Sequence, residues 1–398
     1  MSDNKTTNRI IPWGSLPDEI LTNIFVFLPI KSIIIFTSVS KAWKSLIKNP
    51  TFISTHLNHS LNKNKNQNLL FIGLCSENQK EFYALHNEDD ADFTQHARFD
   101  YPFRAPPYNG KYIVLGTCNG LLFLSKVFHG DNSLCLWNPC VGKLLKLPSP
   151  NITYAKHRRF RASLGFGFDP KTKDYKVIRV VTLLESFDLE RTRPQVEIYT
   201  LSTGQWRTIT TGLAPICALY WTDRQTFISG ALHWVACFKD SDNNIHDFVL
   251  VFDLGEEVFH KILLPEFPGH RGRISGSVSV YRNSIALFQT DNGFLHIWAM
   301  KEYDVVSSWT KLFSLPLLDQ NFFGANSIRT ALGFRRNGEV ILKLNGGRLI
   351  SVDLETPEDP DTREIKDLRI MGYEETIVDY YVESLVLLDK ATNSEDTY

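Results

Sequence analysis

The chain beyond residue 69 repeats one arrangement of short strands, and this repeat constrains the fold more than any other feature. In each copy an apolar strand precedes a strand that alternates around an aromatic residue, and a third strand follows, often ending in Leu-Pro. The middle strands are "FYALH" (82–86), "LCLWNP" (134–139), "VEIYTL" (196–201), "VLVFDL" (249–254), "LHIWAM" (295–300) and "LISVDL" (349–354). They recur at intervals of roughly 46 to 62 residues, which is typical of the four-stranded blades of a β-propeller.

A fourth strand stands upstream in five of the six copies, and only the first copy lacks one. These strands are "KYIVLGT" (111–117), "SLGFGFD" (163–169), "QTFIS" (225–229), "GSVSVY" (276–281) and "RTALGF" (329–334). An apolar strand that belongs to no copy, "YYVESLVLL" (380–388), remains near the end. Pairing it with the first copy would close the ring and cover exposed strand edges. We therefore predict an all-β propeller of six blades, closed by the C-terminal strand.

The residues before the repeat have the pattern of three short helices. Apolar residues recur at helical spacing from Leu16, Pro29 ends the first helix, Ser40 is placed to cap the third, and Pro50 follows it. A bundle of about 40 residues buries too little surface to cover all of its apolar side chains. The surplus either packs on the rest of the chain or forms a docking patch for a partner helix.

The segment "LPDEILTNIFVFLPIKSIIIFTSVSKAWKSLIKNPTFISTHL" (16–57) resembles an F-box, with two Leu-Pro pairs and a Val-Ser-Lys-x-Trp centre. The resemblance implies that the patch binds the Skp-type adaptor of a Skp–cullin–F-box ubiquitin ligase. The residues that match the adaptor-binding motif are Leu16, Pro17, Ile20, Leu21, Ile24, Leu28, Pro29, Ile33, Val39, Trp43 and Leu46. The run "IIIF" (33–36) departs from the family, which more often has a basic or polar residue there.

The repeat region resembles the plant F-box-associated domain, often labelled kelch-like. The motifs that carry the likeness include "TCNGLLFL" (117–124), "LWNPCVGKLLKLP" (136–148), "GFGFDPKTKDYKVIRV" (165–180) and "SGALHWVA" (229–236). A regular Gly-Gly doublet, which true kelch repeats have, is missing. The family domain is thought to hold the ligase's target. Similar groups include S-locus F-box proteins, which recognise pistil ribonucleases, and F-box proteins that restrain immune receptors; the sequence does not choose between them.

These patterns divide the chain into a disordered tail (1–13), an F-box (14–58), a polar Asn/Lys-rich linker (59–68), a propeller (69–390) and a second tail (391–398). The formal charge of −1 gives no reason to expect nucleic acid or an anionic membrane as a partner. The polar start lacks a signal segment, and polar residues interrupt the longest apolar run, 20–36. We expect a cytoplasmic or nuclear protein.

Catalytic and metal-binding motifs are missing from the sequence. The six cysteines form no CxxC pair and indicate buried thiols, "GFGFDP" (165–170) lacks the third glycine of a nucleotide fingerprint, and His233 and His296 lie in apolar strands as expected of core histidines. We predict no cofactor, no metal and no catalytic residue. A non-ligase propeller scaffold stays open as an alternative, as does a propeller hydrolase with carboxylates converging at the ring centre.

Three loops are candidates for target contacts: 154–162, 183–195 and 268–275. The first and third are basic, which suits an acidic or phosphorylated target. The candidate target-binding residues are Lys156, Arg158, Arg159, Arg161, His270, Arg271 and Arg273. The expected partners are the adaptor, the cullin and RING protein bound through it, and an unidentified target.

Overall fold

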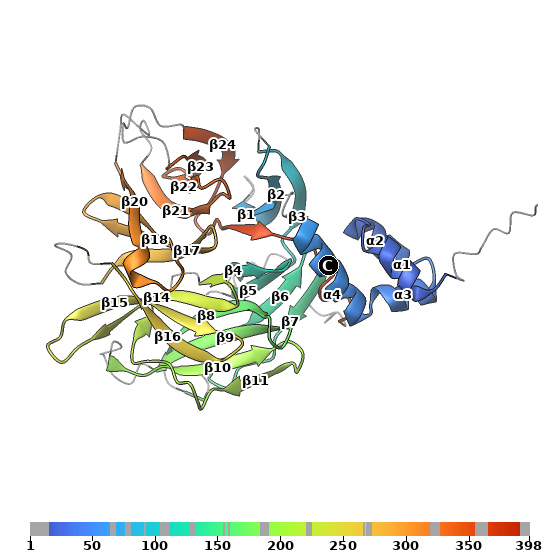
Figure 1. Ribbon diagram of the computed structural model, residues 1–398, viewed down its shortest axis with the longest axis horizontal. Helices are drawn as coiled ribbons and strands as arrows, with labels where there is room; N and C mark the ends of the chain where they lie inside the picture. Colours follow the sequence, from blue (N-terminus) through green and yellow to red (C-terminus); the bar gives the residue numbers. More distant parts are fainter. Residues whose placement is uncertain are drawn as a thin grey trace, which may run out of the picture.

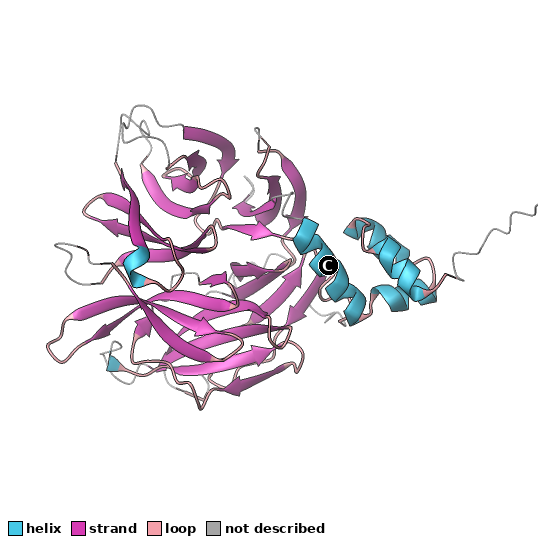
Figure 2. Ribbon diagram, viewed as in Figure 1, coloured by secondary structure: helices cyan, strands magenta, loops and turns pink. Residues whose placement is uncertain are grey.

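The structure, a computed structural model, contains an N-terminal helical unit beside a ring of β-sheets (Figures 1 and 2). It describes residues 16–63, 69–75, 81–90, 93–103, 112–126, 133–153, 156–157, 160–183, 191–219, 225–265, 267, 273–318, 327–354 and 365–390. The tails that the sequence predicts at 1–13 and 391–398 lie outside this part of the chain. Within it, every helix is too short or too polar to cross a bilayer.

The helical unit has four helices, one more than the sequence analysis predicts. They are α1 (Asp18–Phe25), α2 (Ile30–Phe36), α3 (Lys41–Ile47) and α4 (Pro50–Lys63). As expected, Ser40 caps α3: its Oγ accepts a hydrogen bond of 3.1 Å from the Trp43 backbone nitrogen. Helix α4 continues through 59–63, which we assigned to the linker. Its Asn and Lys residues form the polar end of a helix that Phe52, Ile53 and Leu57 anchor in the core.

Six antiparallel sheets surround a central channel, as predicted. Blade 1 contains β25 (Val378–Tyr381), β1 (Leu69–Cys75), β2 (Glu81–Asn87) and β3 (Gln95–Asp100). Blade 2 contains β4 (Tyr112–Cys118), β5 (Leu121–Lys126), β6 (Leu134–Asn138) and β7 (Lys143–Lys146), and blade 3 contains β8 (Phe160–Asp169), β9 (Asp174–Leu183), β10 (Gln195–Thr200) and β11 (Gln205–Thr208).

The remaining three blades follow in chain order. Blade 4 contains β12 (Ala218–Leu219), β13 (Thr226–Ile228), β14 (Ala231–Lys239), β15 (Ile245–Asp253) and β16 (Val258–Leu263); both β12 and β13 pair with β14. Blade 5 contains β17 (Ser275–Tyr281), β18 (Ser284–Asp291), β19 (Phe294–Met300), the short helix η3 (Val306–Ser308) and β20 (Trp309–Pro316). Blade 6 contains β21 (Ile328–Phe334), β22 (Val340–Leu344), β23 (Arg348–Val352) and β24 (Ile365–Met371).

The ring closes where β25 pairs with β1, in a register that joins Leu69 to Tyr381 and Ile72 to Val378. Closure by a C-terminal strand is therefore confirmed, but the strand begins and ends earlier than the predicted 380–388. The chain after Tyr381 leaves the sheet, and Ser384–Leu388 are buried without being part of a strand. Their apolar side chains pack against the helices and blades 2 and 3, so an apolar sequence here does not form a β-strand.

Strand ends alternate between two rims of the ring because neighbouring strands are antiparallel. One rim carries the turns 119–120 and 139–142 of blade 2 and the matching turns of the other blades. We call it the helix-side rim, because the chain beyond Tyr381 and the helical unit pack there. The far rim carries the turns between second and third strands, such as 240–244, and the connections between blades.

The C-terminal segment, Val382–Leu388, joins the helical unit to the ring. Asn138 is fully buried, and its Nδ2 donates to the carbonyl oxygens of Ser384 (2.9 Å) and Val386 (2.8 Å). Gly120 has a φ of +80°, and a Cβ there would lie 2.4 Å from the Val382 carbonyl oxygen, so glycine is required.

One continuous apolar cluster connects the two units. It contains Leu385–Leu388, buried side chains of all four helices, and buried side chains of blades 2 and 3. In Figure 1, α4 lies on the side of the helical unit that faces the ring. Burial, together with the Glu383 carboxylate, raises the pKa of the Cys140 thiol in turn 139–142 to about 12. The helical unit is thus packed on the propeller.

We expect Asn138→Ala to lower the free energy of unfolding by about 2–4 kcal/mol, because two buried carbonyl groups lose their donor. Urea unfolding of the purified chain measures this. Asn58→Ala, a change at an exposed position of α4, serves as the control and should stay within about 0.5 kcal/mol of wild type. Equal stability of the two variants would contradict the role given to Asn138.

A second prediction concerns pH. His233 is fully buried, with Nδ1 3.2 Å from the Thr226 carbonyl oxygen and Nε2 2.7 Å from the Tyr303 hydroxyl, and burial lowers its pKa to about 4. Because the unfolded chain binds this proton more readily, stability is lost as pH falls from about 6.5 towards 4. Between pH 7 and pH 5 the loss attributable to this residue should be about 2 kcal/mol. His233→Gln should lack that part of the pH dependence; an unchanged slope would contradict it.

Candidate functional site

The core of the helical unit is an aromatic cluster. The rings of Phe25, Phe36 and Trp43 lie with centroids 5.0 to 5.4 Å apart. Leu21 and Ile33 are buried in the same cluster. Two of the predicted adaptor-binding residues, Leu21 and Ile33, are thus inside the unit, and Trp43 is half-buried against Phe25. Leu21 and Ile33 therefore do not lie on the surface of the helical unit.

Other predicted adaptor-binding residues lie on the surface. Pro17 and Pro29 are exposed at the starts of α1 and α2, and Ile20, Ile24 and Val39 are 46%, 39% and 59% exposed. The half-buried ones are Leu16, Leu28, Trp43 and Leu46. We call Ile20, Ile24 and Val39, with the two prolines, the docking face. Isolated apolar residues on a surface are ordinary, but several on one small unit indicate an interaction site.

The sequence analysis missed three exposed apolar residues of this unit, Phe27 (66%), Ile35 (65%) and Leu61 (38%). Phe27 continues the spacing of Ile20 and Ile24 (i, i+4, i+7), so helical periodicity could have identified it. Its ring lies edge-on against His59 of α4, with centroids 4.7 Å apart. Ile35 belongs to the "IIIF" run, in which Ile33 faces the core.

The candidate target-binding residues are only partly described. Arg158, Arg159, His270 and Arg271 lie outside the described residues. Lys156, Arg161 and Arg273 are exposed and belong to the far rim, because they precede or begin the innermost strands β8 and β17. Lys156 and Arg161 belong to blade 3 and Arg273 to blade 5, so the fold brings them to one rim from two separate blades.

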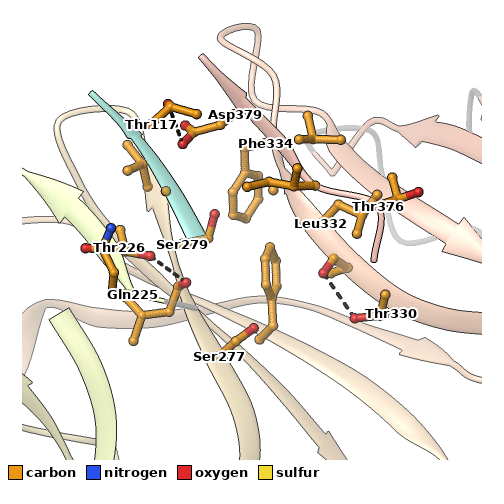
Figure 3. A pocket seen from close by; sticks show the side chains of 18 of the residues that line it. Thr117, Gln225, Thr226, Ser277, Ser279, Thr330, Leu332, Phe334, Thr376 and Asp379 are labelled. Atoms are coloured by element: carbon orange, nitrogen blue, oxygen red, sulfur yellow. Dashed lines mark hydrogen bonds between the residues drawn. The ribbon is translucent and has the colours of Figure 1, made fainter. Parts of the chain in front are cut away.

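The central channel contains a cavity of about 350 Å³. Figure 3 shows its polar lining, which includes Thr117 from β4, Thr226 from β13, Ser277 and Ser279 from β17 and Thr330 from β21. An adjoining pocket opens between Arg329 and Asn345 at the far rim and shares Thr330, Lys343 and Glu374 with the channel. Sequence analysis did not identify this site, because its residues are spread over five blades.

Carboxylates of the channel lining are Glu374, Glu375 and Asp379. Asp379 accepts hydrogen bonds of 2.8 Å from the Thr117 hydroxyl and from the Tyr380 backbone nitrogen, a pattern that fastens β25 to β4. Elsewhere, the fully buried Glu197 forms an ion pair with Arg179 of the same blade. In the part of the chain that the structure describes, groups of His, Cys, Asp and Glu that could hold a metal are absent.

Comparison with known proteins finds a matching family model for each of the two units. The F-box domain model matches residues 13–55, and the model of the F-box associated beta propeller domain matches residues 102–387. F-box protein CPR1 of Arabidopsis thaliana is 27% identical over 371 residues, covering 89% of this chain and 85% of that protein. An F-box/kelch-repeat protein of the same plant is 26% identical over 79% of this chain and 83% of its own length.

Among solved structures, the Dos1 propeller aligns with a TM-score of 0.36 and 14% identity over 77% of this chain and 76% of that one, which is too distant to carry an argument. The two domain models account for the helices and for most of the ring. The chain belongs to the F-box protein family and is a plant F-box protein with a C-terminal F-box-associated β-propeller domain.

Proposed function

We propose that this chain is the substrate-recognition subunit of a Skp–cullin–F-box ubiquitin ligase. An F-box next to a propeller, and the F-box relatives, support a role of this general kind. The observation that carries the proposal is the docking face, whose apolar side chains stay exposed although the helical unit is packed on the ring. The adaptor would bind this face, and cullin and RING protein would join through the adaptor.

The mechanism in this proposal is proximity. The propeller holds a target, and a separate conjugating enzyme transfers ubiquitin to it, so no side chain of this chain acts on the reacting atoms. Holding lysines of the target near the charged enzyme raises their effective concentration. The buried cluster between helices and ring favours one fixed direction of presentation.

The far rim is the target-binding side in this proposal. Of the exposed large apolar side chains in the described propeller residues, six lie there: Leu213, Ile216, Leu263, Phe294, Leu318 and Met371. Three lie on the helix-side rim: Val258, Val305 and Val306. Lys156, Arg161 and Arg273 add positive charge to the far rim, which suits a target with apolar and acidic groups.

Two other functions have distinct signatures. A scaffold that uses the adaptor without a ligase would bind the adaptor and fail to co-purify cullin. A hydrolase would need two carboxylates acting together in the channel, and the hydrogen bonds of Asp379 favour a structural role for that residue. We place the protein in the cytoplasm or nucleus, where imaging of a tagged chain can test it.

The double variant Ile20→Asp/Ile24→Asp should weaken adaptor binding at least 100-fold. A partner would cover the exposed 46% of Ile20 and 39% of Ile24, which is worth about half of the roughly 1.5–3 kcal/mol for a whole side chain. Each aspartate would add the cost of burying an unpaired carboxylate, and about 1.4 kcal/mol corresponds to a factor of ten. Calorimetric titration with a plant Skp-type adaptor measures the change.

The matched control is Leu61→Asp, an apolar residue of similar exposure (38%) on α4, which should leave the affinity within about threefold of wild type. Unfolding of both variants should match wild type, because the substituted side chains are exposed. Tight adaptor binding by the folded double variant would show that the docking face is elsewhere.

The far rim is tested by Leu318→Asp/Met371→Asp against Val305→Asp/Val306→Asp, which changes exposed apolar residues of the opposite rim. The measurement is proximity labelling by the tagged chain in cells without active cullin, where targets of the ligase accumulate. The first variant should no longer label the accumulated proteins that the wild-type chain labels. The second should keep them. Retention by the far-rim variant, or loss by both folded variants alike, would contradict the assignment.

A further inference from the structure

The channel contains hydrogen-bonding groups that have no partner within the described protein. Ser277 and Ser279 alternate along β17, so both hydroxyls face the cavity (Figure 3), and neither has a hydrogen bond within the described residues. The side chain of Gln225 is 92% buried: its relative exposure is 8%. Its Nε2 donates to the Phe166 carbonyl oxygen at 3.2 Å, while its Oε1 has no hydrogen-bond partner among the residues that the structure describes. A buried oxygen left unsatisfied costs free energy that a ligand donor would recover.

The backbone around Gln225 is built to hold this amide. Gly116 of β4 lies directly against it, and a Cβ at that position would be 2.6 Å from Gln225 Nε2. Any other residue at 116 would displace the amide. The next residue, Thr226, is fixed by its hydroxyl, which donates 2.7 Å to the Val278 carbonyl oxygen between the two serines. The amide of Gln225, which directly precedes β13 of blade 4, and the two serines on β17 of blade 5 are therefore held in neighbouring blades.

The lining also indicates the class of ligand. Ser277 and Ser279 can each donate a hydrogen bond, and Gln225 Oε1 can accept one, so the site matches a molecule whose groups do both, as hydroxyls do. Beside them, Phe288 and Phe334 lie with ring centroids 5.1 Å apart and provide apolar surface. The charged groups of the lining are three carboxylates, Glu374, Glu375 and Asp379, and one ammonium, Lys343, so the cavity disfavours anions. Lys343 donates to the carbonyl oxygens of Tyr373 and Glu374, and Asp379 accepts from Thr117 and Tyr380, so these two charges are engaged within the protein.

We infer that the channel is a binding site for a neutral, hydroxyl-rich small molecule of about monosaccharide size. The cavity volume lies at the lower end of the range for small-molecule sites. The adjoining pocket at Asn345 and Glu374 provides a route from the far rim. The site uses no residue of the docking face, so it stands or falls apart from the ligase function proposed above.

The test uses the full chain purified with its Skp-type adaptor. Saturation-transfer NMR is recorded with D-glucose and myo-inositol as neutral probes and with D-glucuronate and D-glucosamine as charged ones. Wild type should transfer saturation to at least one neutral probe at millimolar concentration and less to the charged probes. Ser279→Leu, which fills the cavity, and Gln225→Leu, which removes the acceptor, should weaken binding at least tenfold.

Ser275→Ala is the matched control, because Ser275 lies on the same strand outside the cavity lining and should leave binding unchanged. If Ser279→Leu does not fold, the smaller change Ser277→Ala replaces it, with a weaker loss expected. Absence of transfer to both neutral probes would mean that the channel holds only water and would overturn the inference. Stronger binding of a charged probe, or undiminished binding by folded Ser279→Leu and Gln225→Leu, would overturn it as well.

Discussion

The pairing of β25 with β1 is the contact on which the rest of the structure depends. It completes blade 1 from the two ends of the propeller, and without it β1 would present an open strand edge. The same strand carries Asp379 into the channel, where it binds Thr117 of blade 2. It also delivers the C-terminal segment to Gly120 and Asn138. The closure of the ring, the wall of the channel and the attachment of the helices therefore all depend on the pairing of β25 with β1.

The packing of the helical unit on the ring explains how so small a unit can be stable and still expose apolar side chains. Its inward side chains, such as Leu21 and Ile33, join an apolar cluster that continues into the blades, so the unit does not rely on its own interior. That support leaves Ile20, Ile24 and Val39 free to stay exposed. In the proposed ligase, the same cluster would fix the direction from docking face to far rim, a geometry that a flexible linker would not provide.

Much of the fold could be predicted from the sequence, because alternation along a strand is local and a ring must satisfy every strand edge. The C-terminal end of α4 could not be predicted, because Asn and Lys residues indicate that a segment is exposed to solvent and do not distinguish a helix from a linker. "YYVESLVLL" misled for a related reason: Leu385–Leu388 are apolar because they pack against helices, and not because they form a strand. In the helical unit, residue type alone did not reveal that Leu21 faces inward while Phe27 faces outward. The cavity lies beyond sequence reasoning because blade closure assembles it.

The closing ladder also sets a schedule for biosynthesis. Its two strands are separated by about 300 residues, which a ribosome needs about 15–60 s to add at typical elongation rates. During that interval the edge of β1 has no partner strand. The helices, which emerge first, lack the C-terminal segment, Val382–Leu388, that later packs against their inner side. A cell that makes this protein must therefore shield the growing chain until the segment after Tyr381 has been made.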